Sequence, residues 1–441
     1  MNKKDNFTGK WGFIIACMGS AIGMGNIWLF PARISALGGF AFLVPYIICV
    51  VVIGLTGVME EITFGRAMET GSGSAFGKAM RLNGKSEKVG NTLSLVPVLS
   101  GLALAIGYSV VVGWILKYLV QSFSGELYTA DGVEALGGMF GETASSFGNV
   151  PFHILGLVIT FAIMIFGISK GIEKANKVMM PLFFVMFIGL AIYIATLPGA
   201  SEGYKYLFSP NWSALADPKT WMYALGQSFF SLSLAGSGTI VYGSYLKKDV
   251  DIKSSAKYIA LFDTMAAVIA SLVIIPAMAV VGEKLSSGGP GLMFIFLPNV
   301  FKSIPYGNIA MIIFFIAVLF AGLSSLVNLF ETPVEALQSR LSLTRKAAVA
   351  IVAVVGTVVG ILIEGIVSGW MDVCSIYLCP IGALIAAAIF FWILKPDYIK
   401  EQINIGAKSP IGDWFVPMGR YGFCGLTAAV LVLGTIFGSI G

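Results

Sequence analysis

The stretch GSAIGMGNIWLFP, residues Gly19 to Pro31, decides the fold of this chain. It lies inside the first long apolar segment, yet it places three glycines within seven residues and ends in a proline. Inside a lipid bilayer, every backbone N–H and C=O that a helix loses needs a replacement partner. The sequence therefore predicts a membrane helix that is interrupted near its middle, where the freed backbone groups bind something polar.

The composition of the chain is that of a membrane protein. Hydrophobic residues make up 57% of the 441 residues and charged residues only 12%, whereas a soluble domain carries about 25% charged residues. The mean hydropathy is +0.88. These values predict an all-α polytopic membrane protein, with the lipid bilayer as a partner. We expect the first apolar run to be a retained helix, because no small-residue cleavage site follows it.

Segments that cross a bilayer as helices need about 20 apolar residues each. The sequence predicts eleven of them, at residues 11–36, 41–64, 91–123, 151–168, 177–198, 220–245, 256–282, 308–337, 347–368, 373–394 and 417–439.

The basic residues predict how these spans are oriented. Of the 28 Lys and Arg residues, 22 fall on the side of the membrane that holds the N-terminus. Because cytoplasmic loops are enriched in Lys and Arg, we expect a cytoplasmic N-terminus in the cell inner (plasma) membrane. An odd number of spans then places the C-terminus outside the cytoplasm. The same loops account for the net charge of +5, so no nucleic-acid partner is expected.

A second segment shares the oddity of the first. SFFSLSLAGSGT, residues Ser228 to Thr239, also places small and hydroxyl residues in the middle of a span. The two interrupted spans lie five helices apart, so each of them opens a repeat of five helices, at residues 11–198 and 220–394. Helix 11 (417–439) follows the two repeats, and the whole chain, 1–441, forms one transporter domain. A repeat of five helices is inverted in the membrane, and paired interrupted helices indicate a transporter's central site. Close packing of helices through glycine is the alternative explanation, and Asn26 and Pro31 fit it poorly.

A broken helix suits two kinds of ligand. The free N–H groups at the start of a helix carry a partial positive charge and suit a carboxylate. The carbonyls freed at the other side of the break are oxygen ligands, which Na⁺ requires.

Four motifs in their expected spans resemble the neurotransmitter:sodium symporter family. They are GSAIGMGNIWLFP, the FFSLSLAGSG of the sixth span, the AGLSS of the eighth span and the loop GISKGIEK. The chain is similar to the 11-helix bacterial members that transport leucine or tyrosine. The resemblance implies a 5+5 inverted-repeat fold with broken helices 1 and 6. It also implies symport of Na⁺ with an amino acid by alternating access, and no enzyme activity.

The resemblance implies two sodium sites. The first would use Ala21, Asn26, Ser231 and Asp263. The second would use the carbonyls of Gly19, Ile22 and Ala321 and the hydroxyls of Ser324 and Ser325.

The resemblance also implies where the amino acid binds. Its carboxylate would meet the N–H groups around Met24 and Gly25 and the hydroxyl of Tyr108. Its amino group would meet carbonyls near Ala21, Phe230 and Ser233, and Phe230 and Tyr108 would close the pocket from outside. The remaining expected substrate-binding residues are Ser20, Leu104, Ser231, Gly236, Ser325 and Leu329.

Asp263 departs from the family pattern, which has a neutral Asn at this place in the seventh span. A carboxylate in mid-membrane costs about 2.5–3.5 kcal/mol on insertion scales, so it is a candidate functional residue. Asp263 could ligate Na⁺ and supply the negative charge that chloride brings in chloride-dependent members. We therefore expect chloride independence. Proton exchange at Asp263 during the return step is a further hypothesis.

The gates also depart from the family pattern. Leu29 stands where an outer-gate Arg is usual, and Arg33, one turn on, could reach Asp372 or Gln227. An absent outer ion pair is the alternative. On the inside, Lys4 and Phe7 stand in place of an Arg and a Trp, and Ser339 stands in place of their acidic partner.

Gly171 and Pro181 bracket the start of the fifth span, and both disfavour helix. In this family that spacing lets the inner end of the helix unwind and admit water to the second sodium site; a plain loop boundary is the alternative.

The substrate class follows from two positions. Ser20 stands where amine transporters carry Asp, so the substrate should bring its own carboxylate. Gly236 replaces a bulky residue, and Leu104 and Leu329 would line the same pocket. We expect an aromatic or bulky aliphatic neutral L-amino acid, although one methylene changes affinity by only about 1–3 kcal/mol.

Other classes remain as alternatives. A sodium-conducting channel would need a continuous polar lining, and a membrane enzyme would need a cluster of His, Asp or Glu. A substrate sensor on the same fold stays open. Five cysteines in apolar segments and the single histidine, His153, supply no metal motif, and we expect His153 at the membrane interface. A monomer or a loose dimer is expected.

Overall fold

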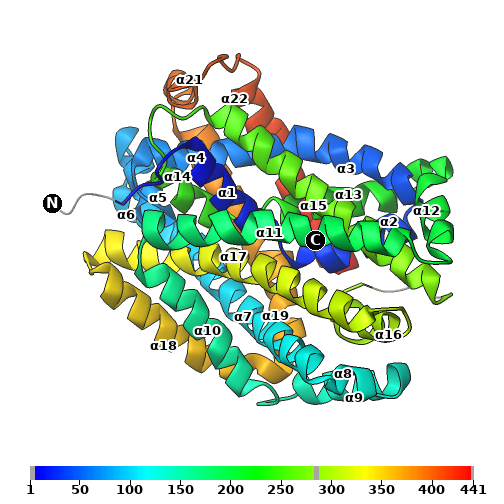
Figure 1. The fold of residues 1–441 in the computed structure, drawn as a ribbon. Coiled ribbons are helices and arrows are strands. Elements are labelled where there is room, and N and C mark those ends of the chain that lie inside the picture. The colour runs from blue at the N-terminus through cyan, green and yellow to red at the C-terminus, as the bar shows by residue number, and fades with distance from the viewer. Residues whose placement is uncertain (1–4, 283–287, 439–441) are drawn as a thin grey trace.

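The computed structural model describes residues 5–282 and 288–438. Its long helices run in roughly one direction across Figure 1, with helix axes side by side and short helices at the two ends. In this part of the chain, helices cover all eleven predicted spans.

The helices of the first half are α1 (Lys10–Ala21) with α2 (Phe30–Ala36), α3 (Leu43–Cys49) with α4 (Leu55–Met68), α7 (Leu95–Ser124), α10 (Val150–Ile165) and α11 (Glu173–Ala195). Those of the second half are α13 (Pro218–Ser231) with α14 (Gly238–Ser244), α15 (Ile252–Val280), α17 (Gly307–Leu341), α18 (Arg345–Ile363) and α20 (Cys379–Ala388), followed by α23 (Cys424–Phe437). The connecting helices are α5 (Ser72–Leu82), α6 (Glu87–Leu93), α8 (Glu126–Thr129), α9 (Gly132–Thr143), α12 (Ala200–Phe208), α16 (Leu297–Lys302), α19 (Val367–Val373), α21 (Pro396–Asn404) and α22 (Phe415–Pro417).

Seven helical segments of the described residues are long and apolar enough to cross a bilayer, and the bent pair α1–α2 makes an eighth. One of the seven, Arg345–Ile393, has 49 residues. At 1.5 Å per residue it would extend for about 73 Å if it were straight, more than one bilayer thickness. Its 3₁₀ turn, Glu364–Ile366, lies where the sequence predicts the end of the ninth span. The count of eleven crossings stays a prediction.

Both predicted interruptions are confirmed. α1 ends at Ala21, Ile22 is extended (ψ 107°), and the chain bends by 55° before it continues through a π-helical turn, Gly25–Leu29, into α2. α13 ends at Ser231 and α14 begins at Gly238. The backbone between these helices turns through left-handed conformations at Ser233 (φ 55°) and Gly236 (φ 66°).

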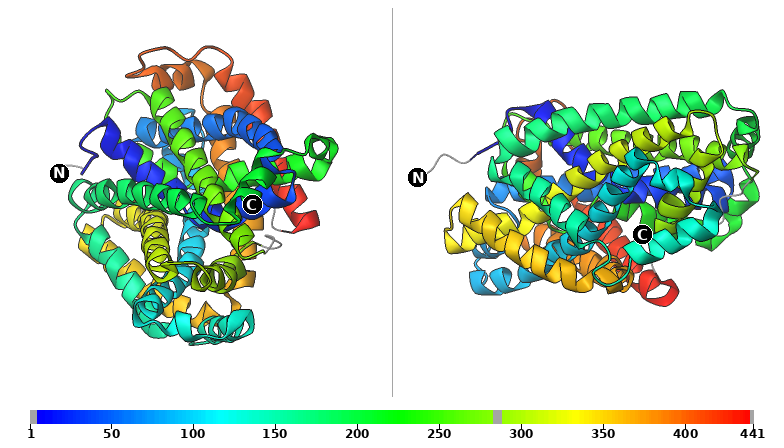
Figure 2. Two further views of the ribbon diagram at one scale, coloured as in Figure 1. Left: turned by 45° about the vertical axis from the view of Figure 1, so that its right-hand side comes forward. Right: turned by 60° about the horizontal axis from the view of Figure 1, so that its bottom comes forward.

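The helices form two groups that pack against each other. In one group, α7, α10, α17 and α18 contact one another, and Figures 1 and 2 show them together on one side of the molecule. In the other group, α1 packs on α11 and α15, and α14 packs on α4. Contacts of α17 with α1 and α11 join the two groups. The interruptions of α1 and α13 therefore lie in the centre of the protein.

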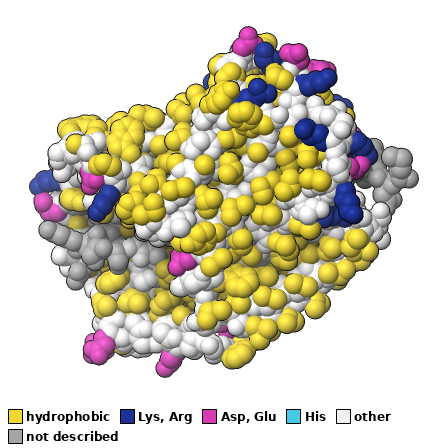
Figure 3. Space-filling model, turned by 180° about the vertical axis from the view of Figure 1, so that it is seen from behind, with side chains coloured by type: hydrophobic (Ala, Val, Ile, Leu, Met, Phe, Trp, Pro, Cys, Tyr) yellow, Lys and Arg dark blue, Asp and Glu magenta, His cyan; other side chains and the backbone are white. Residues whose placement is uncertain are grey.

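Figure 3 shows a broad apolar surface on the back of the molecule, with Lys and Arg gathered mainly at one end. Among the described residues, large apolar side chains are well exposed, including Val185 (65%), Ile192 (64%) and Leu362 (67%). An apolar surface of this extent requires a nonpolar surrounding, which the bilayer provides.

His153 is not at the interface, so that prediction is wrong. The side chain is fully buried, with Nε2 2.8 Å from Ser109 Oγ and Nδ1 2.9 Å from Glu364 Oε1. A β-carbon on Gly360 would lie 2.8 Å from the ring, so the glycine makes room for it. The histidine thus joins α7 and α10 to the end of α18.

Candidate functional site

The first cluster of buried oxygen atoms lies where the break of α1 meets α13 and α15. Asn26 Nδ2 donates to Asp263 Oδ1 at 2.8 Å and lies 3.2 Å from Ser231 Oγ. Ser231 Oγ lies 2.9 and 2.8 Å from the two carboxylate oxygens of Asp263. The Tyr46 hydroxyl approaches the same carboxylate at 3.4 Å. All four side chains are buried, and Ala21, the last residue of α1, lines the same cavity as Asn26 and Ser231.

This donor set fits Na⁺. Asn26 Oδ1 accepts from Gly23 N at 3.0 Å in the structure, and the orientation of an amide group is assigned from such bonds. Turning the amide over would bring its oxygen toward Ser231 and Asp263. The cluster then presents an amide oxygen, a hydroxyl and a carboxylate to a cation.

The second cluster joins the break of α1 to the middle of α17. Ser325 Oγ lies 3.1 Å from the carbonyl oxygens of both Gly19 and Ile22, and Ser324 Oγ lies 2.9 Å from the carbonyl of Ala321. The hydroxyl of Ser325 has one proton, so it satisfies only one of its neighbouring carbonyls. The structure thus brings together the oxygens of Gly19, Ile22 and Ser325, while Ser324 bonds to Ala321 within α17, beside Ser325 in the sequence. Their role as sodium ligands stays a prediction.

A cavity of about 70 Å³ lies between the two breaks. Met24 N donates to the Tyr108 hydroxyl at 3.0 Å, and Ser233 Oγ donates to the Ser20 carbonyl at 3.0 Å. The ring of Phe230 packs on Gly25, where a β-carbon would lie 3.2 Å from Cδ1. Eleven of the twelve predicted substrate-binding residues line the cavity: Ser20, Ala21, Met24, Gly25, Leu104, Tyr108, Phe230, Ser231, Ser233, Ser325 and Leu329.

Gly236, the twelfth, is not among the residues that line the described cavity, so its predicted place is wrong. Its backbone is left-handed (φ 66°), and a β-carbon would overlap with the Gly382 carbonyl oxygen and lie 2.8 Å from the carbonyl carbon. Glycine is therefore required here by the backbone and by the close approach of α20. A side chain at position 236 would meet α20, so its absence does not widen the cavity.

Two buried carboxylates of α4, Glu60 and Glu61, were not predicted from the sequence. Glu61 is buried and accepts from the backbone N–H groups of Ala235 (3.1 Å) and Gly236 (2.7 Å), so it holds the interrupted segment between α13 and α14. Its neighbour Glu60 is buried too. The sequence VMEEITF places both carboxylates inside a predicted span, and charged residues inside a span are candidate functional residues. Asn328, which also lines the cavity, carried no such signal.

At the predicted outer gate, Arg33 bonds to one of its two candidate partners. Its guanidinium donates to Gln227 Oε1 at 2.8 Å and lies 5.3 Å from the centre of the Tyr223 ring. Asp372 lines a separate cavity of about 270 Å³ beyond Phe230 and Tyr108. No ion pair between Arg33 and Asp372 is present in residues 5–282 and 288–438.

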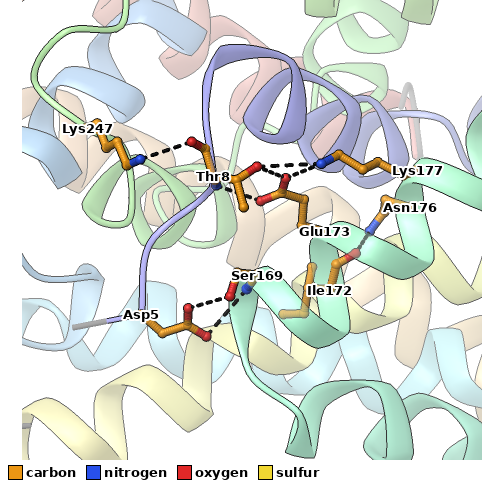
Figure 4. A network of polar contacts seen from close by, with 8 residues as sticks. All are labelled: Asp5, Thr8, Ser169, Ile172, Glu173, Asn176, Lys177 and Lys247. Carbon is orange, nitrogen blue, oxygen red and sulfur yellow. Dashed lines mark hydrogen bonds and ion pairs between the residues drawn. The ribbon is translucent and has the colours of Figure 1, made fainter. Parts of the chain in front are cut away.

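At the predicted inner gate, Lys4 lies outside the described residues. Phe7 is buried and packs edge-on against Phe13 and Tyr242, with ring centres 5.5 and 5.4 Å apart. The hydroxyl of Ser339 lies 3.2 Å from the hydroxyl of Ser74, which belongs to α5 and not to the N-terminal segment. The N-terminal segment is instead held by residues 168–173 at the start of α11 (Figure 4) and by Tyr245 and Lys247 after α14.

The segment between Gly171 and Pro181 is helical in the structure. A π-helical turn, Ile168–Ile172, leads directly into α11, and Pro181 lies inside that helix. The unwinding suggested for this segment stays a prediction.

An all-helical membrane protein whose two interrupted helices meet at buried oxygen clusters has the architecture of a cation-coupled transporter. The model of the Sodium:neurotransmitter symporter family matches residues 4–135 and 135–395. The chain belongs to this family. It is therefore a sodium-coupled transporter and not an enzyme.

Similar proteins agree with this assignment. An uncharacterized sodium-dependent transporter of Methanocaldococcus jannaschii is 30% identical over 99% of this chain and 90% of its own length. The sodium-dependent neutral amino acid transporter B(0)AT3 of Mus musculus is 28% identical over 63% of this chain and 48% of its own length. The crystal structure of MhsT in complex with L-phenylalanine superposes with a TM-score of 0.84 at 35% identity, and covers 98% of this chain and 99% of MhsT.

Proposed function

We propose that this protein imports a neutral hydrophobic L-amino acid, aromatic or bulky aliphatic, together with Na⁺, by alternating access and without chloride. The observation that carries the proposal is the central cavity, in which the N–H groups after the break of α1, bonded to side chains rather than to helix carbonyls, lie between two oxygen clusters. A substrate with one carboxylate, one ammonium group and an apolar side chain matches this arrangement.

The polar groups of the cavity suggest how the amino acid is held. Its carboxylate would replace the Tyr108 hydroxyl as the acceptor of the Met24 N–H and would lie close to the first sodium ion. Its ammonium group would bond to backbone carbonyls near Ala21 and Phe230. Ser20 brings no negative charge, which disfavours an amine without a carboxylate.

The apolar part of the cavity suggests the substrate class. Leu104, Leu329 and Ile376 line it, and Phe230 covers it. The structural relative MhsT was crystallised with L-phenylalanine, and the mouse relative is named for neutral amino acids. Because Gly236 no longer supports a widened pocket, the size preference rests on these apolar residues and on the relatives.

Chloride independence rests on Asp263. Its carboxylate is buried against Ser231 and Asn26, in the first oxygen cluster. A fixed negative charge beside the first sodium ion makes a mobile anion unnecessary, because the ion's charge is already balanced. We propose two sodium sites, a cytoplasmic N-terminus and a monomer or loose dimer in the inner membrane.

The test is uptake of labelled tyrosine, tryptophan and leucine into proteoliposomes with an inward Na⁺ gradient, in chloride and in gluconate. We expect accumulation of at least one of them that needs Na⁺ and is equal in the two anions. Accumulation of none would contradict the substrate class. Na⁺-dependent binding without accumulation would contradict transport, and accumulation only in chloride would contradict the role of Asp263.

A further inference from the structure

An apolar groove of about 810 Å³ opens on the surface of the protein, and its lining residues differ from those of the central cavity. It is lined by α3 with the π-helical turn Val50–Gly54 that follows, by the first two turns of α13, and by α23. Because α13 contacts both α3 and α23, it forms the floor of the groove between them. Ile48 (44% exposed) and Phe437 (54% exposed) border the groove, so it is open to the bilayer.

The charged residues that line the groove, Asp217 and Lys219, lie together at the start of α13. Both are exposed. Asp217 caps the helix, since its Oδ1 accepts from Lys219 N at 2.9 Å. Neither side chain forms an ion pair within residues 5–282 and 288–438. The groove therefore has a charged mouth, with one carboxylate and one ammonium group, and apolar walls beyond it.

Two tryptophans place the charged mouth at the level of the lipid headgroups. Trp212 precedes α13 and is 59% exposed, and Trp221 lies in its first turn and is 40% exposed. The indole Nε1 of Trp221 donates to the Leu215 carbonyl at 2.9 Å. Exposed tryptophans gather at the boundary between the hydrocarbon core and the headgroups. The mouth of the groove thus meets headgroups, and its apolar walls meet acyl chains.

The length of the groove matches one leaflet of a bilayer. On α23 its wall runs from Leu426 to Phe437, which are eleven positions apart. At 1.5 Å per residue, this distance is about 16 Å. Half of the hydrocarbon core of a bilayer measures about 15 Å. A single acyl chain that starts at the interface can therefore lie along the whole groove.

We propose that this groove binds one phospholipid with a primary ammonium group, as in phosphatidylethanolamine. The lipid phosphate pairs with Lys219, the lipid ammonium pairs with Asp217, and one acyl chain lies along α13 between α3 and α23. This inference goes beyond the proposed function and does not depend on the transported substrate.

The carboxylate of Asp217 selects the headgroup. An ammonium group donates charge-assisted hydrogen bonds to a carboxylate. The headgroup of phosphatidylglycerol has a phosphate and no cation, so Asp217 repels it. The headgroup of phosphatidylcholine has a cation without an N–H, so it makes no such bond. Phosphatidylethanolamine alone among these three lipids complements both charges of the mouth.

The experiment titrates the purified full chain in detergent with these three lipids, all with the same acyl chains. Native mass spectrometry gives the apparent dissociation constant of the first bound lipid. The midpoint temperature of unfolding with and without lipid is the second readout, because a ligand of the folded state stabilises it. Ala429→Trp fills the groove, which Ala429 lines. Val432→Trp is the matched control, because it adds the same indole to α23 at an exposed residue (55%) outside the groove.

Two variants test the headgroup. Asp217→Asn removes the negative charge and keeps a residue that caps helices well, and Lys219→Gln removes the positive charge. Wild type should bind phosphatidylethanolamine about two- to fivefold more tightly than the other two lipids, the range of an exposed ion pair. Asp217→Asn should lose this preference. Lys219→Gln should weaken phosphatidylethanolamine and phosphatidylglycerol alike, by about two- to fivefold.

Ala429→Trp should lose the first binding step and the rise in midpoint temperature, whereas Val432→Trp should match wild type. The proposal is overturned if Ala429→Trp binds phosphatidylethanolamine like wild type, or if wild type binds phosphatidylglycerol equally tightly. A dimer that Ala429→Trp dissociates and Val432→Trp does not would assign the groove to a second copy of this chain, which also overturns it. Should Ala429→Trp fail to fold, Asp217→Asn decides, since an unchanged lipid preference in that variant contradicts the proposal.

Discussion

Replacing Gly236 with alanine separates two explanations of this glycine. The structure places Gly236 in a left-handed conformation (φ 66°) with α20 directly against it. The left-handed conformation costs about 1–2 kcal/mol for a residue with a β-carbon. The overlap with the Gly382 carbonyl adds about 1–3 kcal/mol, as for other overpacked sites. Gly236→Ala should therefore destabilise the protein by about 2–5 kcal/mol.

The effect should extend to the bond between the Gly236 N–H and Glu61 (2.7 Å), because relief of the overlap moves the backbone. Thermal stability in detergent, followed by intrinsic fluorescence, measures the first effect. Competition of small and large amino acids for Na⁺-driven uptake measures selectivity. We expect lower stability and lower uptake of every substrate, with no change of preference.

The control is Gly189→Ala on α11, where no atom lies within 4 Å of an added β-carbon. Alanine in a helix is favoured over glycine by about 0.5–1 kcal/mol, so this variant should be at least as stable as wild type. If Gly236→Ala were as stable as wild type and shifted preference toward small amino acids, Gly236 would line the pocket and our interpretation would be refuted.

Three further predictions concern ion coupling and the gates. Asp263→Asn should make uptake depend on chloride, measured by replacing chloride with gluconate; equal uptake in both anions would contradict the charge argument. Arg33→Ala removes the bond to Gln227 (2.8 Å), a loss of about 1.5–3 kcal/mol for a charged donor. Bound substrate should therefore dissociate about 10- to 100-fold faster in a chase experiment, and Gln227→Ala should do the same. Glu173→Gln weakens the hydrogen bonds between α11 and Thr8 of the N-terminal segment. A thiol reagent added on the side of the membrane that holds the N-terminus should then label Cys17, which is only 5% exposed, several times faster than in wild type. Unchanged labelling would show that this contact does not close the inner side.

The sequence by itself determined where the helices lie and where two of them break. Both are local properties, since a run of about 20 apolar residues must be helical in lipid and clustered glycines weaken it there. The motifs also predicted which oxygen atoms gather at each cluster. The structure brings together Asn26, Ser231 and Asp263 in one, and Gly19 with Ser325 in the other.

Only the tertiary structure decided what each side chain faces. An interrupted helix loses the 3.6-residue periodicity that relates one residue's direction to the next, so sequence spacing could not show that Gly236 faces α20. The partner of Arg33 depends on how α2 and α13 are placed, and the burial of His153 depends on glycines of other helices. From the sequence alone, Asn176 is an ordinary polar residue near the start of a helix. The packing of α1 on α11 places it against Gly19, which lies 157 positions earlier in the sequence.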